Sequence, residues 1–283
     1  MISPFLQDQS LIADIERVAP DSADIQLWWL GQSGFLLHWQ GRHLLLDPYL
    51  SDSLTEKYAN TDKPHVRLTE RAVAPIALSF IDVVTSSHNH TDHLDAKTLK
   101  PLFQVNPNLK LVIPEANRQF VADRLEIDPD RPIGMDAGQS IEVADFTFNA
   151  VAAAHESIEK DESGHCRCLG YVIEAGPWTI YHSGDTMFYD GMVETLKKWN
   201  IDVCILPING KSAERRVAGN LNGSEAAMLA KKIGARLVIP CHFEMFQFNT
   251  ASPSQFERAA TDLQQPFQVL RCGEQWSSMN ISK

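Results

Sequence analysis

Cysteine, positive charge and long apolar runs are all scarce in this sequence of 283 residues. Its five cysteines include no pair with zinc-ribbon or redox spacing, so neither a disulfide framework nor a zinc ribbon is indicated, and a reducing compartment is favoured. Lysine and arginine number 25 against 36 aspartates and glutamates, a net charge of -11. This acidic balance disfavours nucleic acid as a partner and gives no attraction to anionic membranes.

No stretch of the sequence is both apolar and long enough to cross a membrane. The longest apolar run, residues 72–84, is interrupted by Pro75, Ser79 and Asp82. The first residues contain no basic segment followed by an apolar core, so no signal peptide is expected. No linker or low-complexity segment divides the chain. We therefore expect one domain over residues 1–283, located in the cytoplasm.

Short apolar runs bounded by turn residues predict many β-strands. The expected strands are residues 25–30, 35–39, 43–46, 83–87, 109–113, 146–152, 169–174, 179–182, 203–206 and 237–239. Helices are expected at residues 94–103, 115–125, 192–199, 224–233 and 254–264. This order of elements predicts an α/β or α+β sandwich, although periodicity alone does not choose among such folds. Trp28 and Trp29 are expected in its core.

The segment at the end of the 83–87 run is rich in metal-binding side chains. Within six residues it contains His88, His90, Asp92 and His93. An extended backbone would place His88 and His90 on one side, and a helix beginning near Thr91 would turn Asp92 and His93 toward a second point. One loop with this spacing can serve two neighbouring metal ions. Imidazole and carboxylate ligands suit zinc, manganese or iron.

Three further candidate ligands stand where predicted strands end. His155 follows the run 148–154, Asp185 follows the strand 179–182, and His242 follows the run 237–241. Any one of them alone would more often be a surface residue. Together with the first cluster they supply the ligand types that a two-metal site still needs.

The pattern H-x-H-x-D-H, followed at longer separations by His, Asp and His, resembles the signature of the metallo-β-lactamase superfamily. The resemblance implies a four-layer αββα sandwich with a two-metal site at one edge, between the sheets. The implied ligands of one metal are His88, His90 and His155. Those of the second metal are Asp92, His93 and His242, and Asp185 bridges the two.

Longer segments resemble one branch of this superfamily. They are residues 28–35, 181–185, 206–211 and 239–246, and they are similar to the L-ascorbate-6-phosphate lactonase family. The branch implies manganese, the ligand types also permit zinc, and iron is possible. An aspartate at position 185 speaks against the true β-lactamase branch. Residues 52–78 match no motif of the lactonase family, so the identity of the substrate does not carry over.

The resemblance also suggests a mechanism, in which two divalent ions activate a water for attack on a carbonyl or phosphorus centre. Asp92 is the candidate for orienting this water or accepting its proton, and Asp185 for holding the metals at their separation. Asp47, in the sequence Leu-Asp-Pro-Tyr, matches an early aspartate of the superfamily and is expected to order the ligand loop by hydrogen bonds. His182 is expected beside the Asp185 loop in a similar supporting role.

Candidate substrate-binding residues lie in the turn after the 203–206 strand. Asn209 opens this turn, and Lys211, Arg215 and Arg216 form either an anion-binding cluster for a phosphate or carboxylate, or a solvated basic loop. His165 is a further candidate, in the hairpin after His155. The remaining histidines, His38, His43 and His65, are expected to be structural or exposed.

The sequence thus predicts a metal-dependent hydrolase whose substrate is a small ester or lactone, either phosphorylated or not. This small molecule is the expected partner. One alternative is a phosphodiesterase similar to N-acyl phosphatidylethanolamine phospholipase D, although no apolar patch or amphipathic helix for a lipid is evident. Another is an iron-binding oxidoreductase or sensor on the same scaffold. A homo-oligomer is only what the family suggests.

Overall fold

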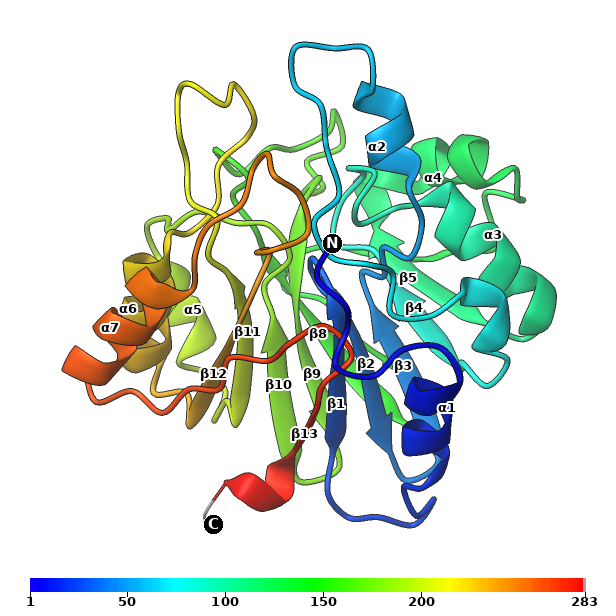
Figure 1. The fold of residues 1–283 in the computed structure, drawn as a ribbon, viewed down its shortest axis with the longest axis horizontal. Helices are drawn as coiled ribbons and strands as arrows, with labels where there is room; N and C mark the ends of the chain where they lie inside the picture. The colour runs from blue at the N-terminus through cyan, green and yellow to red at the C-terminus, as the bar shows by residue number, and fades with distance from the viewer. Residues whose placement is uncertain (282–283) are drawn as a thin grey trace.

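Two β-sheets lie face to face in the computed structural model, which describes residues 1–281, and helices cover the outer side of each sheet (Figure 1). The first sheet has the strand order β13-β1-β2-β3-β4-β5-β6, and the second has the order β12-β11-β10-β9-β8-β7. This arrangement is the αββα sandwich that the sequence predicts, so the expected fold class is confirmed.

The strands are short, and most match the predicted runs to within one or two residues. In the first sheet they are β1 (Gln26–Gly31), β2 (Gly34–Trp39), β3 (Arg42–Leu46), β4 (Val83–Thr85), β5 (Lys110–Pro114), β6 (Ile133–Met135) and β13 (Gln275–Ser277). In the second they are β7 (Ser140–Val143), β8 (Phe146–Ala152), β9 (Leu169–Ala175), β10 (Trp178–His182), β11 (Val203–Pro207) and β12 (Leu237–Cys241).

The helices form the two outer layers. They are α1 (Gln9–Glu16), α2 (Ser53–Tyr58), α3 (Ala96–Val105), α4 (Arg118–Leu125), α5 (Met192–Leu196), α6 (Gly223–Ile233) and α7 (Ser254–Asp262). In Figure 1, α5, α6 and α7 lie outside the second sheet, and α1, α3 and α4 outside the first. Within the part of the chain described, none of these helices has the length and apolar character needed to cross a bilayer.

Strand β1 is buried at every position, and residues 27–30 within it are all apolar. Leu27 and Trp29 belong to the core that contains the second sheet, whereas Trp28 and Leu30 belong to the core under α1, α3 and α4. Alternate side chains of a strand point to opposite faces, and here both faces are covered. The two tryptophans are 0% and 1% exposed, which confirms their predicted core position.

Helix α6 is the element with the clearest sequence signals. The Asn222 side chain accepts a hydrogen bond from the Glu225 backbone N–H, and the Glu225 carboxylate accepts one from the Asn222 N–H. This reciprocal cap satisfies two donors that a helix start leaves unpaired. Gly234 ends the helix with a positive φ of 75°, as predicted from its position.

The strand directions bring the loops of both sheets to one edge. Strands β3 to β6 are mutually parallel, as are β10, β11 and β12. Strand β8 runs the same way as β10, because each is antiparallel to β9. The segments that follow β4, β8, β10 and β12 therefore meet at the carboxyl ends of the strands, where a site is expected.

Three predictions about elements were incomplete. The helix expected from residue 94 begins only at Ala96, and the one expected at 115–125 is a 3-10 turn (Glu115–Asn117) followed by α4. Helices α1 and α2 and strands β6, β7 and β13 had not been predicted. Four of these five elements are only three to six residues long, and α1 has only three buried side chains, so their periodicity is weak.

Candidate metal centre

The loop after β4 presents its histidines through a tight turn, not through a helix. The backbone N–H groups of His93 and Leu94 both donate to the His90 carbonyl, at 3.1 and 2.8 Å. Helix α3 starts later, because the Asp95 side chain caps it by accepting from the Lys97 N–H. The prediction of a helix beginning near Thr91 is therefore wrong, although the turn still brings Asp92 and His93 together, with His93 Nε2 3.8 Å from Asp92 Oδ2.

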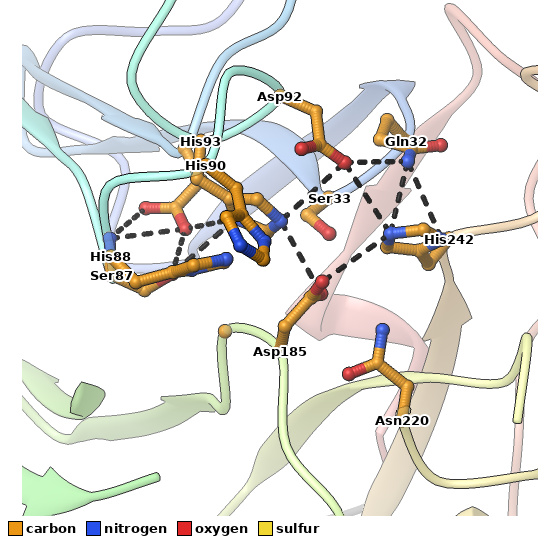
Figure 2. Close-up of polar contacts among 12 residues, drawn as sticks. Gln32, Ser33, Ser87, His88, His90, Asp92, His93, Asp185, Asn220 and His242 are labelled. Carbon is orange, nitrogen blue, oxygen red and sulfur yellow. Dashed lines mark hydrogen bonds and ion pairs between the residues drawn. The ribbon is translucent and has the colours of Figure 1, made fainter. Parts of the chain in front are cut away.

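The seven predicted ligands form two adjacent groups. In each group the potential ligand atoms all lie within 4.8 Å of one another. One group contains His88, His90 and His155, and the other contains Asp92, His93, Asp185 and His242. Four segments that are far apart in the sequence, after β4, β8, β10 and β12, supply them, and Figure 2 shows Asp92, His93, Asp185 and His242 turned toward one another.

The Asp185 carboxylate lies between the two groups. Its Oδ1 is 3.3 Å from His93 Nε2, and its Oδ2 is 3.5 Å from His242 Nε2 and 3.7 Å from His155 Nε2. One carboxylate thus faces histidines of both groups. This is the placement that a bridging ligand requires.

Unsatisfied buried atoms indicate that the site is built for cations. His88 Nε2, His93 Nε2 and Asp185 Oδ1 are buried. His88 Nε2 has no partner among the described residues, and the other two atoms face each other at 3.3 Å without a hydrogen bond of good geometry. A buried polar atom without a hydrogen bond costs about 1–3 kcal/mol, so folded proteins seldom leave several of them together. Coordination of divalent ions would satisfy all three, and nitrogen and oxygen donors are suitable ligands. The residues therefore fit a two-metal centre.

Electrostatics around the second group favour positive charge. Burial opposes ionisation of Asp185, but His242 and His93 outweigh it and hold the pKa of this carboxyl well below its usual range. Burial likewise opposes charge on His242, yet Asp185 and Asp92 raise its pKa to about 9. By contrast, burial lowers the pKa of His88 well below normal, which keeps this imidazole neutral, as a ligand must be.

Hydrogen bonds fix which nitrogen of two histidines faces the site. His155 Nδ1 lies 2.9 Å from the Gly219 carbonyl oxygen, which can only accept, so Nδ1 carries the proton and Nε2 is left for the centre. His93 Nδ1 donates to the Asp47 carboxylate at 2.7 Å. That carboxylate also accepts from the Thr85 hydroxyl and from the Ser87 N–H and hydroxyl. Asp47 thus ties the end of β4 to one ligand.

Gln32 is a site residue that the sequence analysis missed. Its Nε2 donates to Asp92 Oδ2 at 2.8 Å and lies 3.0 Å from His242 Nε2 (Figure 2). The residue sits in the β1–β2 turn with a φ of 52°, a conformation that costs energy for a residue with a side chain. The available signal was its place in the family-like segment 28–35, which was used only to assign the branch.

A cavity of about 410 Å³ opens over the metal ligands. Its lining includes Asp92, Asp185, His90, His155 and His242, together with side chains from α2 and the segment after it. A neighbouring cavity of about 490 Å³ shares His90 and His155 and reaches Lys211. Either cavity has the volume of a small-molecule site.

The predicted substrate-binding residues divide into two sets. Arg216 lines both cavities and pairs with Asp62, and Lys211 lines the second and lies 3.1 Å from Glu156. Asn209, Arg215 and His165 line neither of the cavities described.

Contacts within the protein hold the side chains of these three residues. The buried Asn209 side chain bonds to Asn249 and Asn220. Arg215 is held by the Asn209 carbonyl and Asn249. His165 lies 3.5 Å from Asp161 within its own hairpin.

The supporting role expected for His182 has a different geometry. Its Nε2 donates to the Ser33 carbonyl at 3.0 Å, so it holds the β1–β2 turn next to Gln32 and makes no hydrogen bond to a ligand. His65, expected to be structural or exposed, is 8% exposed and lines the first cavity.

Comparison with known proteins agrees with this geometry. The family model described as "Beta-lactamase superfamily domain" matches residues 42–243, which is most of the chain and includes all seven ligands. The chain belongs to the metallo-β-lactamase superfamily. A curated relative named "UPF0173 metal-dependent hydrolase" from Methanosarcina mazei is 25% identical over 241 residues, covering 84% of this chain and 91% of the relative.

Solved structures of superfamily members share the fold. The metallo-β-lactamase fold protein YhfI from Bacillus subtilis has a TM-score of 0.65 at 19% identity, over 91% of this chain and all of its own (100%). The isothiocyanate hydrolase from Delia radicum gut bacteria has a TM-score of 0.69 at 16% identity, over 89% of this chain and 98% of its own. At these identities the likeness shows the fold alone.

Proposed function

We propose that this protein uses water activated between two divalent metal ions to cleave a small ester or lactone. The coarser part of this statement, a metal-dependent hydrolase of the metallo-β-lactamase fold, rests on the family match, the relatives named as hydrolases and the clustered ligands. The observation that carries the proposal is the Asp185 carboxylate between two groups of histidines, with unpaired buried atoms in both.

Divalent ions held there would lower the pKa of a bound water and stabilise the negative charge that develops on the attacked oxygen. One ion would be held by His88, His90 and His155. The other would be held by Asp92, His93 and His242, and Asp185 would contact both ions.

The chain's own residues prepare this chemistry. Gln32 Nε2 fixes Asp92 Oδ2 at 2.8 Å, so the carboxylate is oriented before substrate arrives and can hold a proton taken from the water at its free oxygen. Asp47 orients His93 through the 2.7 Å bond to Nδ1. A preorganised site of this kind does not have to reorganise during the reaction.

The preference for a lactone or ester follows from the segments similar to L-ascorbate-6-phosphate lactonases. Four cationic side chains line the first cavity, Lys57, Lys63, Arg124 and Arg216. They are compatible with a phosphorylated substrate, although Asp62 already pairs with Arg216. The solved neighbour named isothiocyanate hydrolase indicates that the scaffold also serves other electrophiles. The phosphodiesterase and oxidoreductase alternatives gain no specific support from the described residues.

Two variants with matched controls test the metal assignment. Asp92→Asn and His90→Ala are expected to lower kcat/KM by about 10²–10⁴-fold on whichever substrate the wild type cleaves. Asp190→Asn, at an exposed position, and His165→Ala, outside both cavities, are expected to retain activity. Full activity in the first two variants with two metals bound would disprove the assignment.

A substrate panel tests the reaction. Purified protein loaded with manganese or with zinc is assayed on lactones, phosphodiesters and thioesters, and its metal content is measured after purification without added metal. Hydrolysis of lactones or esters is expected. Hydrolysis of phosphodiesters alone would replace the proposal with the phosphodiesterase alternative.

A further inference from the structure

One buried histidine that is not a predicted metal ligand faces the first cavity. His65 lies in the segment that follows α2. Leu54, Lys57 and Tyr58 of α2 and Lys63 and His65 of this segment line the cavity, although residues 52–69 match no recognisable motif. The imidazole is 8% exposed. It belongs to neither ligand group, so the metal centre does not account for its position.

Aromatic rings hold this imidazole on several sides. It stacks on Tyr58, with ring centroids 4.5 Å apart and an interplanar angle of 29°. The edges of Phe246 and Phe248 meet it at 5.3 and 5.1 Å. The Thr55 hydroxyl donates to the His65 carbonyl at 2.7 Å and fixes the backbone as well. A ring packed in this way has little freedom to rotate.

The protonation of the ring follows from one contact. His65 Nδ1 lies 2.9 Å from the Lys63 carbonyl oxygen, which can only accept, so Nδ1 carries the hydrogen. Burial lowers the pKa of His65, which favours the neutral ring. Nε2 is then a bare acceptor, and among residues 1–281 no hydrogen bond to it is recorded. A fixed acceptor without a protein partner in a cavity wall is suited to contact a ligand.

We propose that His65 Nε2 accepts a hydrogen bond from a hydroxyl or N–H group of the substrate, while the rings around it contact the substrate's carbon skeleton. The inference rests on the proposed function in taking this cavity as the substrate site. It adds a chemical class: a small molecule with a hydrogen-bond donor, in addition to the electrophile that is attacked.

This contact should let the site discriminate between substrates with and without the hydrogen-bond donor. A substrate that lacks the donor leaves His65 Nε2 desolvated and unpaired, so it should bind more weakly. His65 contacts both ground state and transition state in this assignment, so its loss should raise KM more than it lowers kcat.

The kinetic test compares γ-butyrolactone with its α-hydroxy and β-hydroxy derivatives. Wild-type protein is expected to prefer at least one hydroxylated lactone, and His65→Leu is expected to reduce that preference about tenfold, with unchanged metal content. His65→Gln keeps a polar group near the Nε2 position and should restore part of the preference. His43→Leu removes a half-buried imidazole that does not line this cavity. It is the matched control and should leave the preference unchanged.

A binding measurement separates this inference from the proposed function. Zinc-loaded protein with ¹⁵N-labelled histidine is titrated with γ-butyrolactam and its two hydroxylated derivatives, which resist hydrolysis. The His65 Nε2 resonance is expected to move with a hydroxylated lactam and not with the parent. This result without any lactone hydrolysis would refute the proposed reaction and support the contact. A resonance unmoved by both hydroxylated lactams would overturn the inference, whether or not lactones are cleaved.

Discussion

Asp47 shows how much one buried carboxylate can organise. It accepts hydrogen bonds from β4, from the start of the ligand loop and from His93 Nδ1, and it is 0% exposed. Every one of these contacts uses the carboxylate as an acceptor. An amide in its place would present a donor to at least one other donor, so shape alone cannot replace the charge.

We therefore expect Asp47→Asn to weaken metal binding about 10–100-fold, because His93 loses the partner that fixes its proton and its orientation. Competitive titration with a chromophoric chelator measures this affinity. Asp123→Asn, at an exposed position on α4, is the control. An unchanged affinity in Asp47→Asn would show that the loop is held without it.

At the residue scale, the sequence predicted roles for side chains whose chemistry is distinctive. It did not predict roles that depend on the contacts a residue makes in the folded protein. His88 and its neighbours stand out as a cluster, so the ligand set could be proposed from the pattern. Gln32 and His65 are ordinary residues in sequence. The contact of Gln32 with Asp92, and those of His65 with Phe246 and Phe248, join segments that are far apart in the chain.

Among the elements, the β2–β3 hairpin contains two neighbouring histidines outside the metal centre, the buried His38 and the half-buried His43. The rings of His38 and His43 are 4.9 Å apart. Burial, with a smaller contribution from His38, lowers the pKa of His43 to about 4. His38 Nε2 accepts from the Gly41 N–H at 3.2 Å, a bond that requires this ring to be unprotonated at Nε2.

This hairpin should make stability sensitive to acid. The unfolded chain protonates His43 near pH 6.5 and the folded one near 4, so the unfolded state binds more protons between these values. Stability is thus full above about pH 6.5 and declines as the pH falls toward 4, by on the order of 2 kcal/mol between pH 7 and 5. Urea unfolding of wild type and His43→Gln across this range should show a shallower decline in the variant. Parallel curves would contradict the assignment.

The segment after β10 depends on a glycine for its approach to the ligand loop. Gly184 has a φ of 58°, and a Cβ there would lie 2.5 Å from the Ser87 Cβ. Gly138 has a φ of 88° and open space around its Cβ position. The two positions therefore separate backbone strain from steric conflict.

Accordingly, Gly138→Ala is expected to cost about 1–2 kcal/mol, the strain of the left-handed conformation alone. Gly184→Ala should cost more and should also weaken metal binding, since Ser87 and Asp185 are forced apart. Thermal unfolding and metal titration of both variants give the comparison. Equal effects would mean that the contact with Ser87 is unimportant.

For the whole molecule, the main feature is that the predicted ligands come from both sheets. His88, His90, Asp92 and His93 follow a strand of the first sheet, and the other ligands follow strands of the second. Bound ions would thus connect the two halves of the sandwich. Because the unfolded chain has no such arrangement, binding energy adds to folding stability.

Zinc or manganese in excess is therefore expected to raise the Tm and a chelator to lower it, with about 2.7 kcal/mol gained at a free metal concentration of 100 times Kd. His155→Ala, which removes a ligand on the second sheet, should reduce the shift. Differential scanning calorimetry measures both. A Tm that does not depend on metal would be inconsistent with a centre that joins the sheets.

At this scale the αββα sandwich could be predicted because the ligand pattern implied it; strand periodicity alone left several folds open. The order of strands within each sheet, and the edge strand β13 contributed by residues near the carboxyl terminus, could not. Strand β13 has three residues and pairs with β1, some 250 positions earlier, as in the Gln26–Ser277 pairing. No local signal encodes a partner so distant.

The segment of residues 52–69 supplies cavity wall without supplying a single ligand. Natural variation there can alter what the enzyme accepts while leaving the coordinating atoms untouched. Substrate specificity can therefore change while the reaction is preserved. Proteins that share the seven predicted ligands can then act on different metabolites.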